Sequence, residues 1–236
     1  MKVEASAIVT VGIPVIALLV IGLFIVGFVT AGRRLDHASP SLLFVLFGCV
    51  AWLAVPGVLA ASGVLARFEM RPPPLGLVIG VHVLLAIVLA LSPIGRRFAM
   101  GLPLAALIGA QAFRLPLEMV MHQAAREGVM PVQMSYSGWN FDIVTGASAI
   151  FVSELLAWGR MPRWGVVVWN AMGSLLLATI MGVAIASVPF IRAFGDAPER
   201  VNSWVAYFPF VWLATVMVPG AIFGHIVIAR RLLAAS

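Results

Sequence analysis

Four polar side chains recur at helical spacing within an otherwise apolar stretch. They are Gln111, Arg114, Glu118 and His122, which are three, four and four residues apart. Residues at this spacing lie on one face of a helix, so the four predict a single polar stripe. Arginine binds carboxylates and other anions, and glutamate and histidine can act as general acid and base. Because charged groups inside an apolar span are costly, this stripe is the first candidate functional site.

A second group of polar residues opens the next apolar stretch. Asn140 is a suitable N-cap for a helix, and Asp142 in the first turn gains from the positive end of the helix dipole. Capping alone therefore explains both residues. The alternative is that Asp142 and Thr145 belong to a small, polar helix face that lines a cavity beside the stripe.

We predict that Arg114, Glu118 and Asp142 share one outward-facing polar pocket. The connection between the two stretches is short, so the helices should form an antiparallel hairpin that brings these residues together. His82, at a depth similar to that of Arg114, or His122 is expected on the pocket wall. The structural alternative is an ion pair between Arg114 and Glu118, four residues apart, that neutralises both charges.

Glu154 and His225 form a second predicted polar pair, at similar depth near the opposite membrane surface. The simpler alternative is that Glu154 reaches outward to Arg160 or Arg163 at that surface.

A metal site is a further alternative for the first group. Glu118, His122 and Asp142 could come within reach of one another, and the methionines near His122 would suit copper. Methionines in a membrane chain more often serve packing, so we predict no metal ligands and leave any cofactor unspecified.

The composition fixes the class of protein that must position these residues. The chain has 236 residues, of which 62% are hydrophobic and 10% charged, and its mean hydropathy is +1.09. These values exclude a soluble globular domain, because ordinary soluble domains are about half apolar and about a quarter charged. The net charge of +6 comes from arginines between apolar runs, which indicates membrane orientation and no nucleic-acid partner. The single cysteine, Cys49, excludes an intrachain disulfide.

Seven apolar stretches are long enough to predict membrane-spanning helices. They cover residues 7–31, 41–64, 75–92, 98–122, 141–159, 165–191 and 205–229. Together they fill nearly the whole chain, so we expect an all-α seven-transmembrane-helix bundle that forms a single transmembrane domain, 1–236. Pro116 should kink the fourth span.

The basic residues favour an N-terminus outside and a C-terminus in the cytoplasm. Eight arginines fall on one predicted side: Arg33, Arg34, Arg96, Arg97, Arg160, Arg163, Arg230 and Arg231. The other side has six basic residues offset by five acids. Paired arginines in short connections are typical of the cytoplasmic side, and an odd number of spans places the two termini on opposite sides.

Several classes of membrane protein are excluded or lack support. Lys2 is the only lysine, so no Schiff base can form in the last span and a retinal-binding rhodopsin is excluded. The seven-helix zinc amidohydrolases would need two histidines on one turn of that span, which has only His225. Phosphate-loop, Gly-x-Ser-x-Gly and His-Glu-x-x-His motifs are also absent from the sequence.

One segment carries a resemblance to a known group. Its residues are Phe113, Arg114, Glu118, His122, Gly128, Pro131, Val132, Gln133, Met134, Gly138, Asn140, Phe141, Asp142, Ile143 and Gly146. This pattern resembles a family of bacterial multi-pass inner-membrane proteins of unknown activity. The resemblance implies a bacterial inner (plasma) membrane and no particular reaction.

Three functions remain open at this point. The first is a small-molecule transporter or ligand-binding protein with an outward-facing polar pocket. The second is a membrane-embedded enzyme or redox subunit that uses Glu118, His122 and Asp142 as acid, base or metal ligands. The third is an accessory subunit whose polar stripe binds a partner membrane subunit or a second copy in the lipid bilayer.

The predicted topology can be tested with reporter fusions. A reporter after Ser236 should behave as cytoplasmic, and one inserted beside Glu127 should behave as exported, because the paired arginines hold the opposite side in the cytoplasm. Alkaline phosphatase and green fluorescent protein at each position give the two readouts. The reversed pattern would contradict the orientation.

Overall fold

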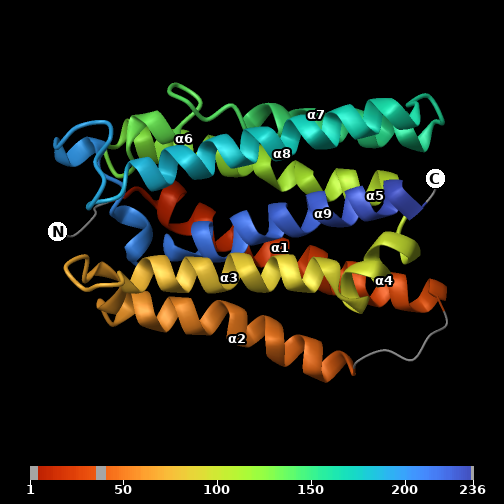
Figure 1. The fold of residues 1–236 in the computed structure, drawn as a ribbon, viewed down its shortest axis with the longest axis horizontal. Coiled ribbons are helices and arrows are strands. Elements are labelled where there is room, and N and C mark those ends of the chain that lie inside the picture. Colours follow the sequence, from red (N-terminus) through yellow and green to blue (C-terminus); the bar gives the residue numbers. More distant parts are fainter. Residues whose placement is uncertain (1–4, 36–40, 235–236) are drawn as a thin grey trace.

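The computed structural model describes residues 5–35 and 41–234 and is helical throughout its regular structure, with no strand in these ranges. Within them, six helices are long and apolar enough to cross a membrane. They are α1 (Ala7–Leu35), α2 (Leu42–Ala61), α3 (Pro74–Leu91), the run Leu104–Arg126, α8 (Arg163–Ala186) and the run Leu213–Ala234. These helices lie side by side along one axis (Figure 1). The chain is therefore a multi-pass membrane protein.

The fifth predicted span, 141–159, is shorter in the structure. α7 (Ile143–Ala157) has 15 residues. At 1.5 Å per residue it covers about 22 Å, less than the roughly 30 Å of the hydrocarbon core. The connection before α7 folds into the bundle, and Met130, Met134 and Asn140 in it are buried. Seven crossings therefore remain a prediction, with six long spans and one short apolar helix in the described residues.

The fourth predicted span, 98–122, is wrong as a single helix. α4 (Pro93–Gly101) ends before Leu102, and α5 (Leu104–Gly109) begins after Pro103. Proline has no N–H and its ring clashes with the preceding turn, and it pushes the residue before it into an extended conformation. Leu102 has φ −108° and ψ 146°, as expected. The break separates a short helix at the membrane surface from the spanning segment.

The spanning segment changes its helical type before Pro116. After α5, the residues Ala110–Phe113 form the 3-10 helix η2, and α6 (Arg114–Arg126) follows. Pro116 therefore lies in the first turn of α6, where a missing N–H costs little. The helical irregularity in this span is the 3-10 segment that precedes Pro116, and a kink at Pro116 itself stays a prediction.

The last span begins later than the predicted range 205–229. The chain enters it through the π-helical segment η6 (Leu213–Met217), which leads into α9 (Val218–Ala234). Pro219 cannot donate to the carbonyl oxygen of Thr215, as the residue at that position of an α-helix would. Trp52 of α2 donates its Nε1–H to this oxygen instead, at 2.7 Å. A side chain from another helix thus satisfies the backbone group that the proline leaves free.

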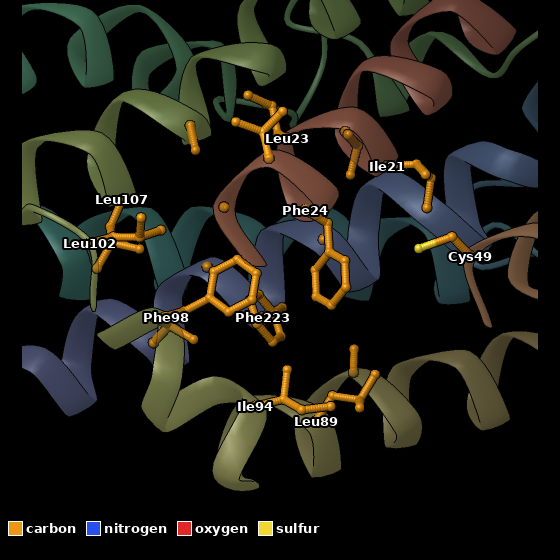
Figure 2. A pocket seen from close by; sticks show the side chains of 18 of the residues that line it. Ile21, Leu23, Phe24, Cys49, Leu89, Ile94, Phe98, Leu102, Leu107 and Phe223 are labelled. Carbon is orange, nitrogen blue, oxygen red and sulfur yellow. The ribbon is translucent and has the colours of Figure 1, made fainter. Parts of the chain in front are cut away.

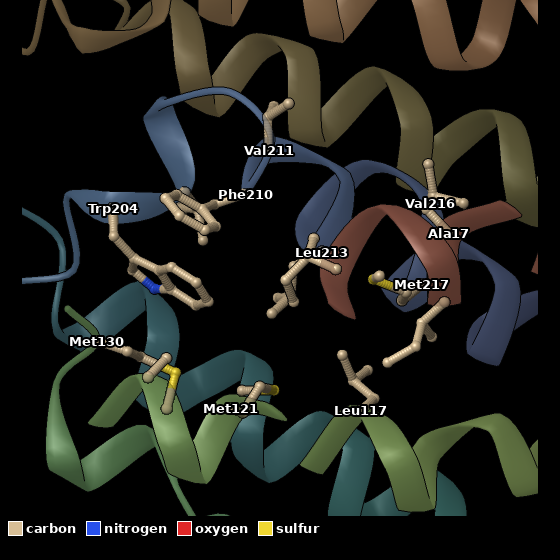
Figure 3. Close-up of a cluster of buried hydrophobic side chains, with 14 of the residues drawn as sticks. Ala17, Leu117, Met121, Met130, Trp204, Phe210, Val211, Leu213, Val216 and Met217 are labelled. Carbon is tan, nitrogen blue, oxygen red and sulfur yellow. The ribbon is translucent and has the colours of Figure 1, made fainter. Parts of the chain in front are cut away.

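Two apolar cores stack along the bundle. The first core, shown in Figure 3, includes Leu117, Met121, Met130, Trp204 and Met217. The second core lies toward the end of the bundle that holds the C-terminus and includes Phe28, Phe98, Ile108, Trp169, Val227 and Ile228. Arginines gather at that same end, where Arg230 donates to the carbonyl oxygens of Ala90 and Ser92.

The α6–α7 hairpin is closed at Gly146. A Cβ atom on Gly146 would lie 2.4 Å from the backbone nitrogen of Leu115, which is far inside van der Waals contact. Only a residue without a side chain therefore lets α7 approach the start of α6 this closely.

The substitution Gly146→Ala should destabilise the protein. Overpacking against backbone costs about 1–3 kcal/mol, and the melting temperature in detergent, followed by fluorescence-detected size exclusion, should fall. The control is Gly80→Ala in α3, where a Cβ meets nothing within 4 Å. This control should leave the melting temperature unchanged or raise it, because alanine favours helix over glycine by about 0.5–1 kcal/mol. Equal melting temperatures would contradict the close packing of the hairpin.

Candidate functional site

Buried polar side chains form one hydrogen-bonded group at mid-depth in the bundle, here called the buried network. It consists of Arg114, Glu118, Asn140, Asp142, Thr145, Asn170 and His225. The network lies where the two apolar cores meet, because His225 stands on α9 between Ala221 of the first core and Val227 of the second. All its members are buried, so it is a closed polar layer between two apolar ones.

An ion pair between the two helices of the hairpin is the centre of the network. Arg114, which is 1% exposed, donates from Nε to Oδ2 of Asp142 at 2.6 Å and from Nη2 to Oδ1. Two parallel bonds of this kind are the strongest way for an arginine to bind a carboxylate. Thr145 adds a bond from its hydroxyl to Oδ1 at 3.3 Å. The charge of Arg114 is thus neutralised by α7.

The third helix joined by Arg114 is α9. Nη1 of Arg114 lies 2.8 Å from Nε2 of His225, and Nδ1 of His225 lies 2.9 Å from Oδ1 of Asn170 on α8. A guanidinium can only donate, so Nε2 must accept and the ring proton must be on Nδ1, where it bonds to Asn170. Asn170 in turn donates to the backbone oxygen of His225 at 3.2 Å. The partners therefore define one neutral tautomer of His225.

Asn140 connects the second carboxyl group to the ion pair. Its Nδ2 donates to Oε2 of Glu118 at 2.6 Å and to the backbone oxygen of Met134 at 3.0 Å. Its Oδ1 accepts the N–H of Asp142 at 3.0 Å. The N-cap residue of α7 is Asp142, whose side chain makes no capping hydrogen bond, so the predicted N-cap at Asn140 is wrong and Asn140 instead orients the residue that begins the helix. Among the described residues, no arginine or histidine forms an ion pair with Glu118. Glu118 is therefore held by the side-chain amide of Asn140, and Asp142 pairs with the cation of Arg114.

The connection between α6 and α7 is held in place by buried polar contacts. Gln133 donates from Nε2 to Oγ of Ser187 at 3.1 Å and to the backbone oxygen of Arg200 at 2.7 Å. These bonds fix the short helix η3 (Val132–Met134), whose last residue accepts from Asn140. A connection that looks solvated in the sequence thus forms one wall of the network.

The structure brings together some of the predicted site residues and leaves others apart. Arg114, Glu118 and Asp142 meet, but as a closed network and not as an open pocket. Arg114 pairs with Asp142 and not with Glu118. The two histidines expected on a pocket wall are elsewhere: His82 bonds to the backbone oxygen of its own helix at 2.7 Å, and the ring of His122 stacks on a tyrosine of the connection at 4.1 Å.

The predicted pairing of Glu154 with His225 does not form. Glu154 is exposed on α7, whereas His225 is buried against Arg114 and Asn170. The predicted ranges 98–122 and 205–229 begin too early, so they assign Arg114 and His225 to different depths. In the structure each residue lies near the middle of its span, Leu104–Arg126 and Leu213–Ala234. The prolines at 103, 209 and 219 are the signal that could have corrected the depths.

Gln111 is the member of the predicted stripe that faces away from the network. It is 2% exposed, and its Oε1 has no hydrogen-bond partner. Its amide packs against Gly224, where a Cβ would come 1.8 Å from Nε2. The side chain lies in the wall of a cavity between α1, α2 and α9.

The described residues contain no group of three histidine, cysteine or acidic side chains that could hold a metal ion. Comparison of the chain with family models, curated proteins and solved structures gives no match. The resemblance of residues 113–146 to bacterial inner-membrane proteins therefore stays a prediction.

The substitution Asp142→Asn should lower the stability of the protein strongly. It leaves the buried charge of Arg114 uncompensated, which costs about 3–5 kcal/mol. The control is Asp196→Asn, because Asp196 pairs with Arg192 at 3.2 Å on the surface, where such pairs contribute about 0–1 kcal/mol. Unfolding in mixed micelles with increasing sodium dodecyl sulfate measures the loss of stability of both variants.

A double variant separates the ion pair from simple packing. Combining Arg114→Gln with Asp142→Asn removes both charges, so the double variant should be more stable than Asp142→Asn alone. Additive losses from the two substitutions would show that the pair is not coupled.

Proposed function

We propose that the protein is a small-molecule carrier of the bacterial inner membrane and that the buried network is its central gate. In this arrangement the N-terminus is outside and the C-terminus cytoplasmic. The structure described here is the closed state, in which Arg114 ties the α6–α7 hairpin to α9. Release of these bonds would open the polar layer toward the outer surface.

The observation that supports this proposal is the composition of the closed layer. A purely structural bundle gains little from a buried ion pair, because apolar residues of the same size stabilise a core as well or better. Ionisable groups inside membrane spans instead mark substrate and ion pathways. Arg114 joins a carboxylate of α7 and an imidazole of α9, so one guanidinium controls the contact between three helices.

The backbone around the network is also irregular. The 3-10 helix η2 ends next to Arg114, and the π-helical segment η6 precedes α9. Interrupted helices at mid-membrane depth are typical of transporters, where they flank the binding site. Two events would release the contact chemically: an anionic ligand that replaces Asp142 on Arg114, or a proton on Nε2 of His225, which would remove the acceptor for Nη1.

The gate can be tested with a cysteine reporter in a Cys49→Ala background. Thr145→Cys places a thiol in the buried network, and it should react slowly with a membrane-impermeant maleimide added outside. Adding Asp142→Asn should raise its labelling rate by at least about tenfold, because the lost pair is worth more than the 1.4 kcal/mol that corresponds to that factor.

The matched control is Ala149→Cys, one turn further along α7 and buried in the second core. Its labelling should stay slow with and without Asp142→Asn. If both thiols become reactive, the variant is unfolded and the network is only structural. If Thr145→Cys stays protected, the network is not a gate.

Transport itself requires a ligand, which a thermal-shift screen of small metabolites can supply, since a ligand at a hundred times its Kd adds about 2.7 kcal/mol of stability. A compound that stabilises the protein should be taken up by proteoliposomes and lose uptake in Arg114→Gln. Binding without uptake would favour a ligand-binding protein over a carrier.

A further inference from the structure

An apolar cavity of about 480 Å³ lies beside the buried network, among α1, α2, α3, α4, α5 and α9. Figure 2 shows its wall, where Phe24, Phe98 and Phe223 meet and Cys49 lies to one side. The rings pack with centroids 5.1 to 5.5 Å apart. Its volume is within the range of about 300–1,000 Å³ that small-molecule sites have.

The cavity opens sideways, between α1 and α2. Val26 of α1 and Phe44 of α2 line it and are 63% and 70% exposed. Both helices present apolar side chains outward along this side, so in a membrane the opening faces lipid tails and not water. A ligand that enters here must come from the bilayer.

Polar groups mark the two ends of the cavity. At the end near the membrane surface the lining includes Arg34, in the last turn of α1. At the deep end it includes Gln111, whose buried Oε1 has no hydrogen-bond partner. A buried acceptor without a donor destabilises the folded protein. A molecule in the cavity that donates a hydrogen bond to Oε1 of Gln111 would remove this cost.

The distance between the two ends follows from the helix geometry. Gln111 packs against Gly224, and the neighbouring Phe223 contacts Phe24 on α1. Phe24 and Arg34 are ten residues apart on α1, which corresponds to about 15 Å along the helix. The occupant therefore needs a group for Arg34 and a donor roughly 15 Å away from it.

The charge at the shallow end selects an anion. Arg33 and Arg34 end α1, and Arg96 and Arg97 are on the adjacent α4. In the described part of the chain, none of these four forms an ion pair with an acid. Arg97 stacks on Phe28 at 4.5 Å, and its Nε has no partner. An anionic head group at Arg34 would meet a strongly positive surface.

We infer that the cavity binds a single-chain anionic lipid that carries a hydroxyl group partway along its chain. The carboxylate lies at Arg34, the chain runs along the aromatic wall, and the hydroxyl donates to Oε1 of Gln111. This site is separate from the gate of the proposed function, and it holds whether or not the buried network opens.

The test uses wild-type protein in phosphatidylcholine nanodiscs and its single native thiol. Cys49 lines the cavity, so a bound chain should slow its reaction with N-ethylmaleimide. The probes are 12-hydroxystearate, stearate and methyl 12-hydroxystearate. The hydroxy acid should give half-protection at a concentration about tenfold lower than stearate does, because stearate has no hydroxyl to donate to Oε1 of Gln111. The neutral ester should protect least. Native mass spectrometry should count one bound hydroxy acid.

Three variants assign the two ends. Gln111→Leu should reduce the preference for the hydroxy acid over stearate to less than about threefold, because the acceptor is gone. Arg34→Gln should weaken both acids by a similar factor and leave the ester unchanged. Arg160→Gln, at the same membrane surface but outside the lining, should change nothing. Each variant is used only if its Cys49 reacts at the wild-type rate without lipid.

Three outcomes would overturn the inference. If the hydroxy acid and stearate protect Cys49 equally, Gln111 does not bind the hydroxyl group. If Gln111→Leu keeps the preference for the hydroxy acid over stearate, the same conclusion follows. If neither acid protects Cys49 and native mass spectrometry detects no bound acid, the cavity is not a lipid site. None of these outcomes affects the maleimide test of Thr145→Cys, so the gate and the lipid site fail independently.

Discussion

A guanidinium buried at the middle of a membrane bundle must find its counter-charge inside the protein. Arg114 has no access to water, and removal of its partner leaves an uncompensated charge at a cost of several kcal/mol. That requirement fixes where α7 begins, because Asp142 must stand at its N-terminus facing α6. It also fixes the tautomer of His225 and, through it, the orientation of Asn170 on α8. Four helices are thus registered against one another by a single side chain.

The same requirement explains why the connection between α6 and α7 is folded inward. Asn140 must reach both the N–H of Asp142 and the carboxyl of Glu118, so the residues before it cannot extend into water. Met130 and Met134 fill the space that results, and Gln133 ties the connection to α8 and to the next loop. α7 is short because part of its depth is taken by this segment. The polar network and the shortened helix are therefore two consequences of one constraint.

The sequence allowed the class of protein, the polar stripe and the proximity of Arg114, Glu118 and Asp142 to be predicted, because hydropathy and helical spacing are local properties. It did not place His225 beside Arg114. Depth in a span depends on where the helix begins, and Pro103 and the chain before Leu213 shift both starts by several residues. The bond from Trp52 to the backbone oxygen of Thr215 shows why such breaks are tolerated: another helix satisfies the group that proline leaves free, and no local pattern records that partner.

Gln111 and Arg114 are three residues apart across the 3-10 segment η2, yet they serve different environments. Gln111 faces the apolar cavity and Arg114 faces the ion pair. A 3-10 helix has weaker hydrogen-bond geometry than an α-helix and is often found at hinges. Its rise of about 2.0 Å per residue means that a return to α-helical geometry would shorten the segment and turn its side chains. Gln111 packs on α9, and Arg114 bonds to Asp142 at the start of α7 and to His225 on α9. The irregular turn thus lets two nearby residues of one span face two separate sites, the cavity and the network.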